Sequence, residues 1–174
     1  MKRTLSRLFA AAMIAATIVG IAAVPAQAAE SRGIIFSTIN GNRRCVDVPA
    51  SSTVVGKKIQ TWSCHNPRRT NQIFETDAPL YNEITYVENV NSGLCLAGWA
   101  NGSQVTQELC SHPNTSWVVR GSPELNAGEF FLQLYGTDRC LAFPSAGTAN
   151  GTPLITWTCR YSRTNPEQIW KVTP

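Results

Sequence analysis

The sequence predicts an all-β fold built from three copies of one structural unit. Three similar segments recur along the chain: GNRRCVDVP (41–49), NSGLCLAGW (91–99) and GTDRCLAFP (136–144). Between them, short apolar stretches alternate with turns rich in Gly, Asn, Pro and Ser, which is typical of β-strands. After residue 28 no stretch keeps the apolar period of 3.6 residues that indicates a helix.

The first 28 residues are expected to be a secretory signal peptide that takes no part in the fold. Three basic residues precede an apolar run over residues 8–24, and AQA (26–28) supplies the small residues of a cleavage site. The run approaches the length of a membrane span, so an uncleaved anchor is the alternative, but the small residues favour cleavage. We therefore expect a secreted, extracellular protein with one domain over residues 29–174 and no stable membrane insertion after cleavage.

Without this segment the chain is nearly neutral. Three of the fifteen Lys and Arg residues and none of the eleven Asp and Glu residues lie in it, so twelve bases face eleven acids and the net charge is near +1. This balance gives no indication of nucleic-acid binding. Residues 43–69 nevertheless contain six basic residues and one acid, Asp47: Arg43, Arg44, Lys57, Lys58, Arg68 and Arg69. They are expected to make one end of the molecule locally positive, with an ordinary solvated face as the alternative.

Each unit continues into a second segment of strict register. GKKIQTWSC (56–64), GSQVTQELC (102–110) and GTPLITWTC (151–159) each place a glycine eight residues before the second cysteine of the unit. The units then close with QIF, TSW and QIW, and their first cysteines lie 50 and 45 residues apart. This period indicates three repeats, over about 33–80, 81–126 and 127–174.

Four short strands are expected in each repeat, in the first IIFSTI, CVDV, KIQTW and QIFET. A β-propeller has a similar period and four strands in each blade, but it needs about four blades or more. Three four-stranded repeats that close around a pseudo-threefold axis therefore predict a β-trefoil.

All six cysteines lie after residue 28, and an even number in an exported chain indicates disulfides. Spacing alone allows 15 pairings of six cysteines, but two cysteines in every repeat suggest bridges within repeats. In the chain-entropy model, a bridge that closes a loop of this length contributes about 3 kcal/mol to the free energy of unfolding. Zinc binding is the alternative, which the lack of any CxxC pair disfavours. The expected bridges are Cys45–Cys64, Cys95–Cys110 and Cys140–Cys159.

An aromatic residue and an amide share one face of the segment KIQTW. Because side chains alternate along a strand, Gln60 and Trp62 point away from the core if Ile59 points into it. A pyranose has an apolar C–H face and a rim of hydroxyls, so an aromatic plane with amides and a carboxylate is a matched surface. The alternative is that Trp62 packs beneath a neighbouring loop.

These residues resemble the ricin B-chain-like, or R-type, lectins with QxW repeats, from about residue 33 to residue 174. The shared signature is Cys-x-Asp, Gln-x-Trp-x-Cys and Asn-Gln-x-aromatic. The resemblance implies a β-trefoil, cysteines paired within repeats, a shallow sugar site in each repeat, and no cofactor or metal. It also implies a glycan or polysaccharide ligand, with galactose-type or xylan-type sugars favoured.

Only the first repeat carries the complete set of site residues. There the resemblance makes Asp47 the acceptor for two sugar hydroxyls, Trp62 the stacking platform and Asn71 a hydroxyl partner. It makes Gln72 a partner that also orients Asp47, and Gln60 a supporting amide beside the platform.

The second and third repeats depart from this pattern. Ala97 and Ala142 replace the carboxylate, so the group that fixes a sugar's orientation is missing from both repeats. The second repeat has Glu108 at the platform position, whereas the third keeps Trp157 but has Ile155 in place of the amide. Both repeats are expected to be structural.

Three closing aromatics and one amide are expected to serve the fold. Trp117 and Trp170 are expected in the core, with Phe74 as a conservative replacement in the first repeat. Gln168 is expected to hydrogen-bond backbone inside its own repeat.

The leading hypothesis is thus a secreted, non-catalytic lectin with one site in the first repeat. The alternative is a protein-binding or inhibitory trefoil with a vestigial sugar groove. Enzymatic activity is not expected, because the chain has no GxSxG, HExxH or phosphate-loop motif. Glu75 and Asp77 could mimic a glycosidase pair, but at a strand end they are expected to be solvated charges.

Overall fold

The computed structural model describes residues 31–39, 41–76, 81–144 and 147–173. The expected signal peptide lies outside these ranges, and so does Asp77. The described residues form β-strands and short 3-10 turns without any α-helix, as the lack of a 3.6-residue apolar period predicted. A helix long and apolar enough to cross a membrane is likewise not found in this part of the chain.

Four strands follow one another in the same order in each repeat. The first repeat contains β1 (Ser31–Ile39), β2 (Asn42–Asp47), β3 (Gln60–Ser63) and β4 (Ile73–Thr76). The second contains β5 (Ile84–Asn89), β6 (Cys95–Ala97), β7 (Thr106–Glu108) and β8 (Ser116–Arg120). The third contains β9 (Glu129–Leu134), β10 (Arg139–Ala142), β12 (Ile155–Thr158) and β13 (Trp170–Thr173), with the short β11 (Thr152–Pro153) before β12.

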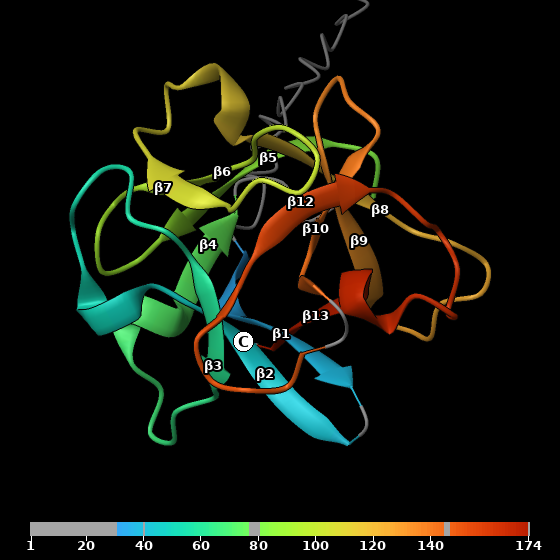
Figure 1. Cartoon of the computed structure of the whole chain (residues 1–174), viewed down its shortest axis with the longest axis horizontal. Coiled ribbons are helices and arrows are strands. Elements are labelled where there is room, and N and C mark those ends of the chain that lie inside the picture. Colours follow the sequence, from blue (N-terminus) through green and yellow to red (C-terminus); the bar gives the residue numbers. More distant parts are fainter. Residues whose placement is uncertain (1–30, 40, 77–80, 145–146, 174) are drawn as a thin grey trace, which may run out of the picture.

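Six of these strands close into an antiparallel barrel. The pairs run from β1 to β4, β5, β8, β9 and β13, and β13 pairs again with β1. The remaining strands except the short β11 form three hairpins, β2–β3, β6–β7 and β10–β12. In Figure 1 the hairpin of the first repeat lies in the lower part, that of the second at the upper left and that of the third to its right. A six-stranded barrel with three hairpins is the predicted β-trefoil.

Three backbone hydrogen bonds join the hairpins in a ring. The amide of Ile59 donates to the carbonyl of Val105 (2.9 Å), Val105 to Leu154 (2.8 Å), and Leu154 back to Ile59 (3.0 Å). These residues occupy the same position in the three repeated segments, and all three are fully buried. The ring therefore marks the pseudo-threefold axis of the molecule.

The closing aromatics fill equivalent places in the core. Trp117 and Trp170 have no exposed surface, and their indole N–H groups donate to the carbonyls of Leu96 (2.9 Å) and Leu141 (3.0 Å). Phe74 is 1% exposed and needs no such partner. Because a buried indole N–H must be hydrogen-bonded, the strand carbonyl beneath each tryptophan fixes its place in the core. The expectation that these aromatics are core residues is confirmed.

Each repeat contains one disulfide, as predicted. Bridges join Cys45 to Cys64, Cys95 to Cys110 and Cys140 to Cys159, and no cysteine is free. One grouping of potential metal ligands in the described residues consists of Glu88, Cys95 and Cys110. Because its two sulfurs are bonded to each other, this group offers no thiolates, and the zinc alternative fails.

Candidate functional site

The first-repeat site begins where the two strands of a hairpin face each other. Asp47 ends β2 and lies directly opposite Gln60, the first residue of β3. The register places the amide nitrogen of Gln60 2.8 Å from Oδ1 of Asp47, to which it donates. The two residues are 13 positions apart in sequence, so the hairpin itself creates this contact.

A 3-10 turn, η2 (Thr70–Gln72), brings two further amides to the same carboxylate. Nδ2 of Asn71 donates to Oδ2 of Asp47 at 2.8 Å, and Nε2 of Gln72 donates to the same oxygen at 3.0 Å. We call Asp47, Gln60, Asn71 and Gln72 the amide–carboxylate cluster. Four of the five residues predicted for the site therefore meet in one hydrogen-bonded group.

The turn is itself fixed to the hairpin. Nδ2 of Asn71 also donates to the carbonyl of Val48 (3.0 Å), and Nε2 of Gln72 to that of Ser63 (3.1 Å). Oε1 of Gln72 accepts from the backbone amide of His65 at 2.9 Å. Oδ1 of Asn71 has no hydrogen-bond partner, and it is the one such buried side-chain N or O atom in the described residues.

Asp47 is more enclosed than the sequence suggested. Only 3% of the residue is exposed, because the amides of η2 and of Gln60 surround it. An ionised carboxylate offers about four acceptor positions, and the three amides occupy three of them. This leaves about one position, at Oδ1, where two sugar hydroxyls were expected. The role of Asp47 toward a sugar stays a prediction, and its observed role is to hold three amides in place.

Trp62 lies on the same face of β3 as Gln60, as strand alternation predicted. Both side chains are partly exposed, whereas Thr61 between them is fully buried. The third repeat borders this face, because β11 pairs with β3. A Cβ built on Gly151 would lie 3.7 Å from Oε1 of Gln60 and 3.9 Å from the ring of Trp62. The third-repeat backbone thus forms a wall of the site that sequence reasoning missed.

Part of the predicted basic cluster borders the first-repeat site. A groove of about 460 Å³ is lined by Lys57, Lys58 and Gln60 together with residues of the other repeats. Arg43 and Arg44 make other contacts: Arg43 stacks 3.7 Å above the ring of Phe36, and Nε of Arg44 donates to the carbonyl of residue 148. Two lysines therefore supply positive charge beside the amide–carboxylate cluster.

In the second repeat a tryptophan contacts Thr106, which stands at the position of Gln60 in the first repeat. The indole N–H of Trp99 donates to Oγ1 of Thr106 (2.9 Å), which donates to Oε1 of Glu108 (2.9 Å). The ring of Trp99 also lies 5.3 Å from that of His112. Sequence reasoning missed this residue, although an aromatic directly after Ala97-Gly98, where the other repeats have proline, was an available signal.

The third repeat keeps the scaffold of the site but changes its chemistry. Ala142 faces Ile155 across β10 and β12, where the first repeat pairs Asp47 with Gln60. A 3-10 turn, η5 (Pro166–Gln168), takes the place of η2. Oε1 of Gln168 accepts from the amide of residue 160 (2.8 Å), and its Nε2 donates to the carbonyl of residue 158 (2.9 Å). The expected backbone role of Gln168 is confirmed.

Glu167 occupies the place of Asn71 in this turn. The amide of Phe143 donates to the carbonyl of Glu167 at 3.3 Å, as the amide of Val48 donates to that of Asn71 at 3.1 Å. The third repeat therefore carries a carboxylate as well, but on the turn and not on the strand.

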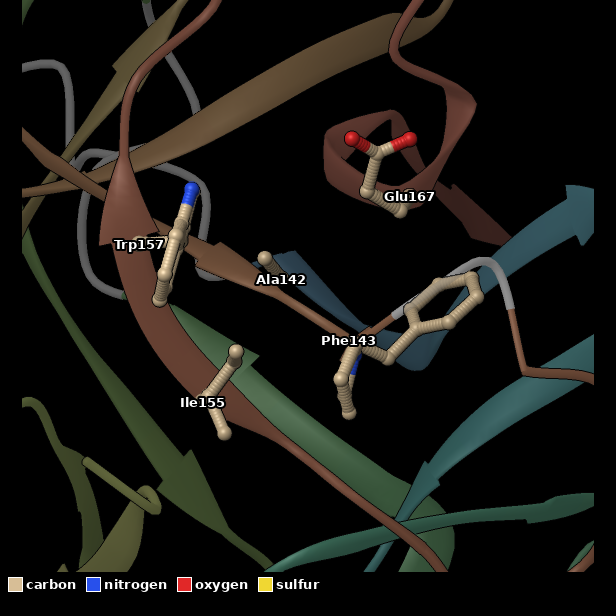
Figure 2. Close-up of a pocket in the computed structure, with 6 residues that line it drawn as sticks. Ala142, Phe143, Ile155, Trp157 and Glu167 are labelled. Carbon is tan, nitrogen blue, oxygen red and sulfur yellow. The ribbon is translucent and has the colours of Figure 1, made fainter. Parts of the chain in front are cut away.

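A pocket of about 180 Å³ opens above Ala142 (Figure 2). Trp157 and Glu167 lie on either side of it, and Trp157 is 41% exposed. The third repeat was expected to be structural, and this pocket was missed because alanine at position 142 leaves space that the sequence does not reveal. We call the site the third-repeat pocket; it is lined by Ala142, Phe143, Pro144, Ile155, Trp157 and Glu167.

The structure gives no support to Glu75 as part of a catalytic pair. Its carboxylate forms an exposed ion pair with Arg32 at 3.1 Å, and its suggested partner Asp77 lies outside the described residues.

The structure thus combines a β-trefoil with a partly exposed tryptophan on the same hairpin face as a carboxylate and an amide, with two further amides bound to that carboxylate. The chain belongs to the ricin-type β-trefoil lectin family, whose sequence model matches residues 32–170. A search of curated proteins gave no match.

Solved structures with the same fold include both lectins and larger proteins. A designed threefold-symmetric protein, ThreeFoil, is similar with a TM-score of 0.69 and 19% identity, over 82% of this chain and 98% of that one. The ricin B-like lectin of Macrolepiota procera in complex with lactose gives 0.61 and 18%, over 82% and 96%. An exo-β-1,3-galactanase from Clostridium thermocellum gives 0.67 and 16%, over 82% of this chain but 30% of that one.

Proposed function

We propose that this protein is a secreted, non-catalytic lectin that binds a sugar through its first repeat. The observation that carries the proposal is the amide–carboxylate cluster, which lies on the same hairpin face as the partly exposed Trp62. Such a surface offers planar donors and acceptors next to an apolar plane, which is what the hydroxyl rim and C–H face of a pyranose require. Neither other repeat combines these groups in the described part of the chain.

In this proposal Trp62 stacks on the C–H face of the sugar. Gln60 meets its hydroxyls, and the acceptor position left at Oδ1 of Asp47 takes one of them. Asn71, predicted as a second hydroxyl partner, uses both hydrogens of Nδ2 on Asp47 and Val48, so it serves here to orient the carboxylate. Gln72 keeps the carboxylate and the turn in place. Because Asp47 already holds three amides, the site is preorganised and little ordering entropy is lost on binding.

The ligand class follows from related proteins and from local charge. Structures of the same fold were solved with N-acetylgalactosamine, with lactose and with methyl α-galactoside, which supports galactose-type sugars. We also propose xylan-type polysaccharides as ligands. Lys57 and Lys58 at the edge of the groove add acidic glycans to the candidates.

One open site for a single sugar ring implies weak binding. About a dozen ligand heavy atoms in a shallow site give roughly −4 to −6 kcal/mol, or a dissociation constant on the order of 0.1 to 1 mM. Tighter attachment to a surface then requires several sugars and several chains at once.

A glycan and polysaccharide array on the oxidised protein, from which residues 1–28 have been removed, tests the proposal. Binding of sugars is expected, followed by titration calorimetry of the best ligand with a stoichiometry near one. Trp62→Ala should abolish measurable binding, and Trp157→Ala, the matched platform in the third repeat, should leave it. Equal losses in the two variants would contradict a single first-repeat site. An empty array, with capture of a protein partner, would favour the inhibitory trefoil.

A further inference from the structure

The third-repeat pocket has a chemical character different from that of the first-repeat site. Four of its six lining residues are apolar, Ala142, Phe143, Pro144 and Ile155. The other two are Trp157, whose indole stands at one side of the pocket, and Glu167 on the opposite side. An apolar floor thus lies between an aromatic ring and a carboxylate.

This pocket is poor in hydrogen-bonding groups for a sugar. Of the three amides that surround Asp47 in the first repeat, two are replaced, by Ile155 and Glu167. The third, Gln168, is buried and uses both ends of its amide on backbone groups. A ligand with a full rim of hydroxyls would leave most of them unpaired here, which disfavours its binding.

The carboxylate of Glu167 is free to take a cation. Among the described residues it forms no ion pair, and no side chain donates a hydrogen bond to it. A carboxylate beside apolar groups attracts a cation more strongly than one in open water, because the local dielectric constant is lower.

Trp157 offers the second attractive element. The face of an indole ring attracts a cation within about 6 Å of its centroid, and tryptophan is the best of the aromatic residues in this respect. The ring is also held in position: a Cβ built on Gly102 of the second repeat would lie 3.2 Å from it. Backbone from another repeat thus packs against the indole, which reduces the cost of ordering it on binding.

We propose that the third-repeat pocket binds a small organic ammonium ion, with a trimethylammonium head group as the preferred ligand. Its methyl groups contact the apolar floor and the face of Trp157, and its charge is balanced by Glu167. A pocket of about 180 Å³ has room for such a head group, because one water needs about 10 to 15 Å³ of such space. This site is separate from the sugar site and does not depend on it.

A neutral twin of the ligand tests the charge requirement. Choline chloride and 3,3-dimethylbutan-1-ol, which has a carbon in place of the nitrogen, are titrated into ¹⁵N-labelled protein, and the indole N–H signal of Trp157 is followed. Choline is expected to shift this signal saturably in the millimolar range, and the alcohol to bind at least about fivefold more weakly. Equal binding of the two would overturn the proposal and leave an unselective apolar cavity.

Variants locate the site. Glu167→Gln keeps the shape of the side chain and should weaken choline binding about fivefold or more, and Trp157→Ala should remove it. Because the Trp157 signal is lost in that variant, binding is then read from choline-observed saturation transfer. The matched control is Glu108→Gln in the second repeat, where the carboxylate is already engaged by Thr106; choline binding should not change.

Two further results would overturn the assignment. The first is choline binding that survives both Glu167→Gln and Trp157→Ala in protein whose amide spectrum shows it to be folded. The second is displacement of choline by methyl galactoside, which would make the pocket a sugar site. Loss of sugar binding in Trp62→Ala would bear on the first repeat alone.

Discussion

The first and third repeats place a carboxylate beside a tryptophan on the same scaffold, yet they surround it with opposite chemistry. In the first, Asp47 on strand β2 is buried under three amides. In the third, Glu167 on the turn lines an apolar pocket, and its carboxylate forms no ion pair with the described residues. Gln72 and Gln168 bind the backbone in the same way in both. The comparison shows that the glutamine makes the same backbone bonds in both turns, although the residues around it differ.

The largest loss of stability is expected when the third repeat receives the carboxylate of the first repeat without its amides. Ala142 is 2% exposed and faces Ile155, so Ala142→Asp would bury a charge without the amides that Asp47 has. We expect a loss of about 3 to 5 kcal/mol in the free energy of unfolding, measured by urea denaturation.

Transfer of the whole cluster should reverse this loss. When Ala142→Asp is combined with Ile155→Gln and Glu167→Asn, the third repeat acquires the amides of the first. Most of the stability should return, and the stoichiometry of sugar binding should rise from one toward two. A triple variant less stable than Ala142→Asp would show that the two repeats differ in backbone as well as in side chains.

Removal of the disulfide of the first repeat or of the third should lower the free energy of unfolding by the same amount. The bridges Cys45–Cys64 and Cys140–Cys159 each span 19 residues, so each is expected to contribute about 3 kcal/mol to the free energy of unfolding. Replacement of each pair by alanine, followed by denaturant titration, measures this. Costs that differ strongly between the repeats would indicate that the unfolded chain retains structure in one of them.

Asp47→Ala gives the first repeat the alanine that the third repeat has at the equivalent position, and it should weaken sugar binding. Hydrogen bonds to a charged group contribute about 1.5 to 3 kcal/mol, so the affinity in calorimetry should fall ten- to hundredfold. The fold should survive, because Asn71 and Gln72 keep their bonds to the carbonyls of Val48 and Ser63. Wild-type affinity in a variant folded by circular dichroism would mean that the sugar lies elsewhere.

The smallest expected effect is the difference in stability loss between breaking a buried and an exposed ion pair. Glu129 on β9 of the third repeat is 6% exposed and lies 2.7 Å from Arg163 and 3.4 Å from Lys171. Glu129→Gln should lower the free energy of unfolding by about 1 kcal/mol, and Glu75→Gln, which breaks the exposed pair of the first repeat, by about 0.5 kcal/mol or less. An equal loss in both would remove this difference between the repeats.

At low pH the ion pairs of Glu129 should no longer contribute to the stability of the fold. Burial raises the pKa of this carboxyl, but hydrogen bonds from Asn126 and Lys171 and the charge of Arg163 lower it more, so the folded-state pKa lies below the ordinary value. A depressed pKa stabilises the fold above the unfolded pKa, and this contribution disappears as the pH falls through the folded one. Urea midpoints of wild type and Glu129→Gln should therefore converge in acid. A gap that persists well below the folded pKa would exclude this linkage.

Features that follow from the repeat pattern and from local sequence were predictable. The trefoil, the three bridges and the shared face of Gln60 and Trp62 follow from spacing, turn residues and strand alternation. The backbone role of Gln168 followed from its place in the closing motif, because a buried amide at a turn satisfies backbone groups on both sides.

Features that depend on how side chains and backbone pack, within a repeat or between repeats, were not predictable. Gly151 borders Trp62 from 89 positions away, and no local pattern pairs the two. The burial of Asp47 depends on how closely η2 approaches the hairpin, which is a matter of packing and not of residue type. The third-repeat pocket arises because a small residue, Ala142, leaves a volume that no neighbour fills.

The ring formed by Ile59, Val105 and Leu154 has no first or last member. Each residue donates once and accepts once, so any of the three repeats could come first in the chain without the loss of a bond. The first and last strands of the chain, β1 and β13, pair with each other in the barrel, so a short linker could join them. A circular permutant that runs through the second, third and first repeats would thus keep every contact of the axis.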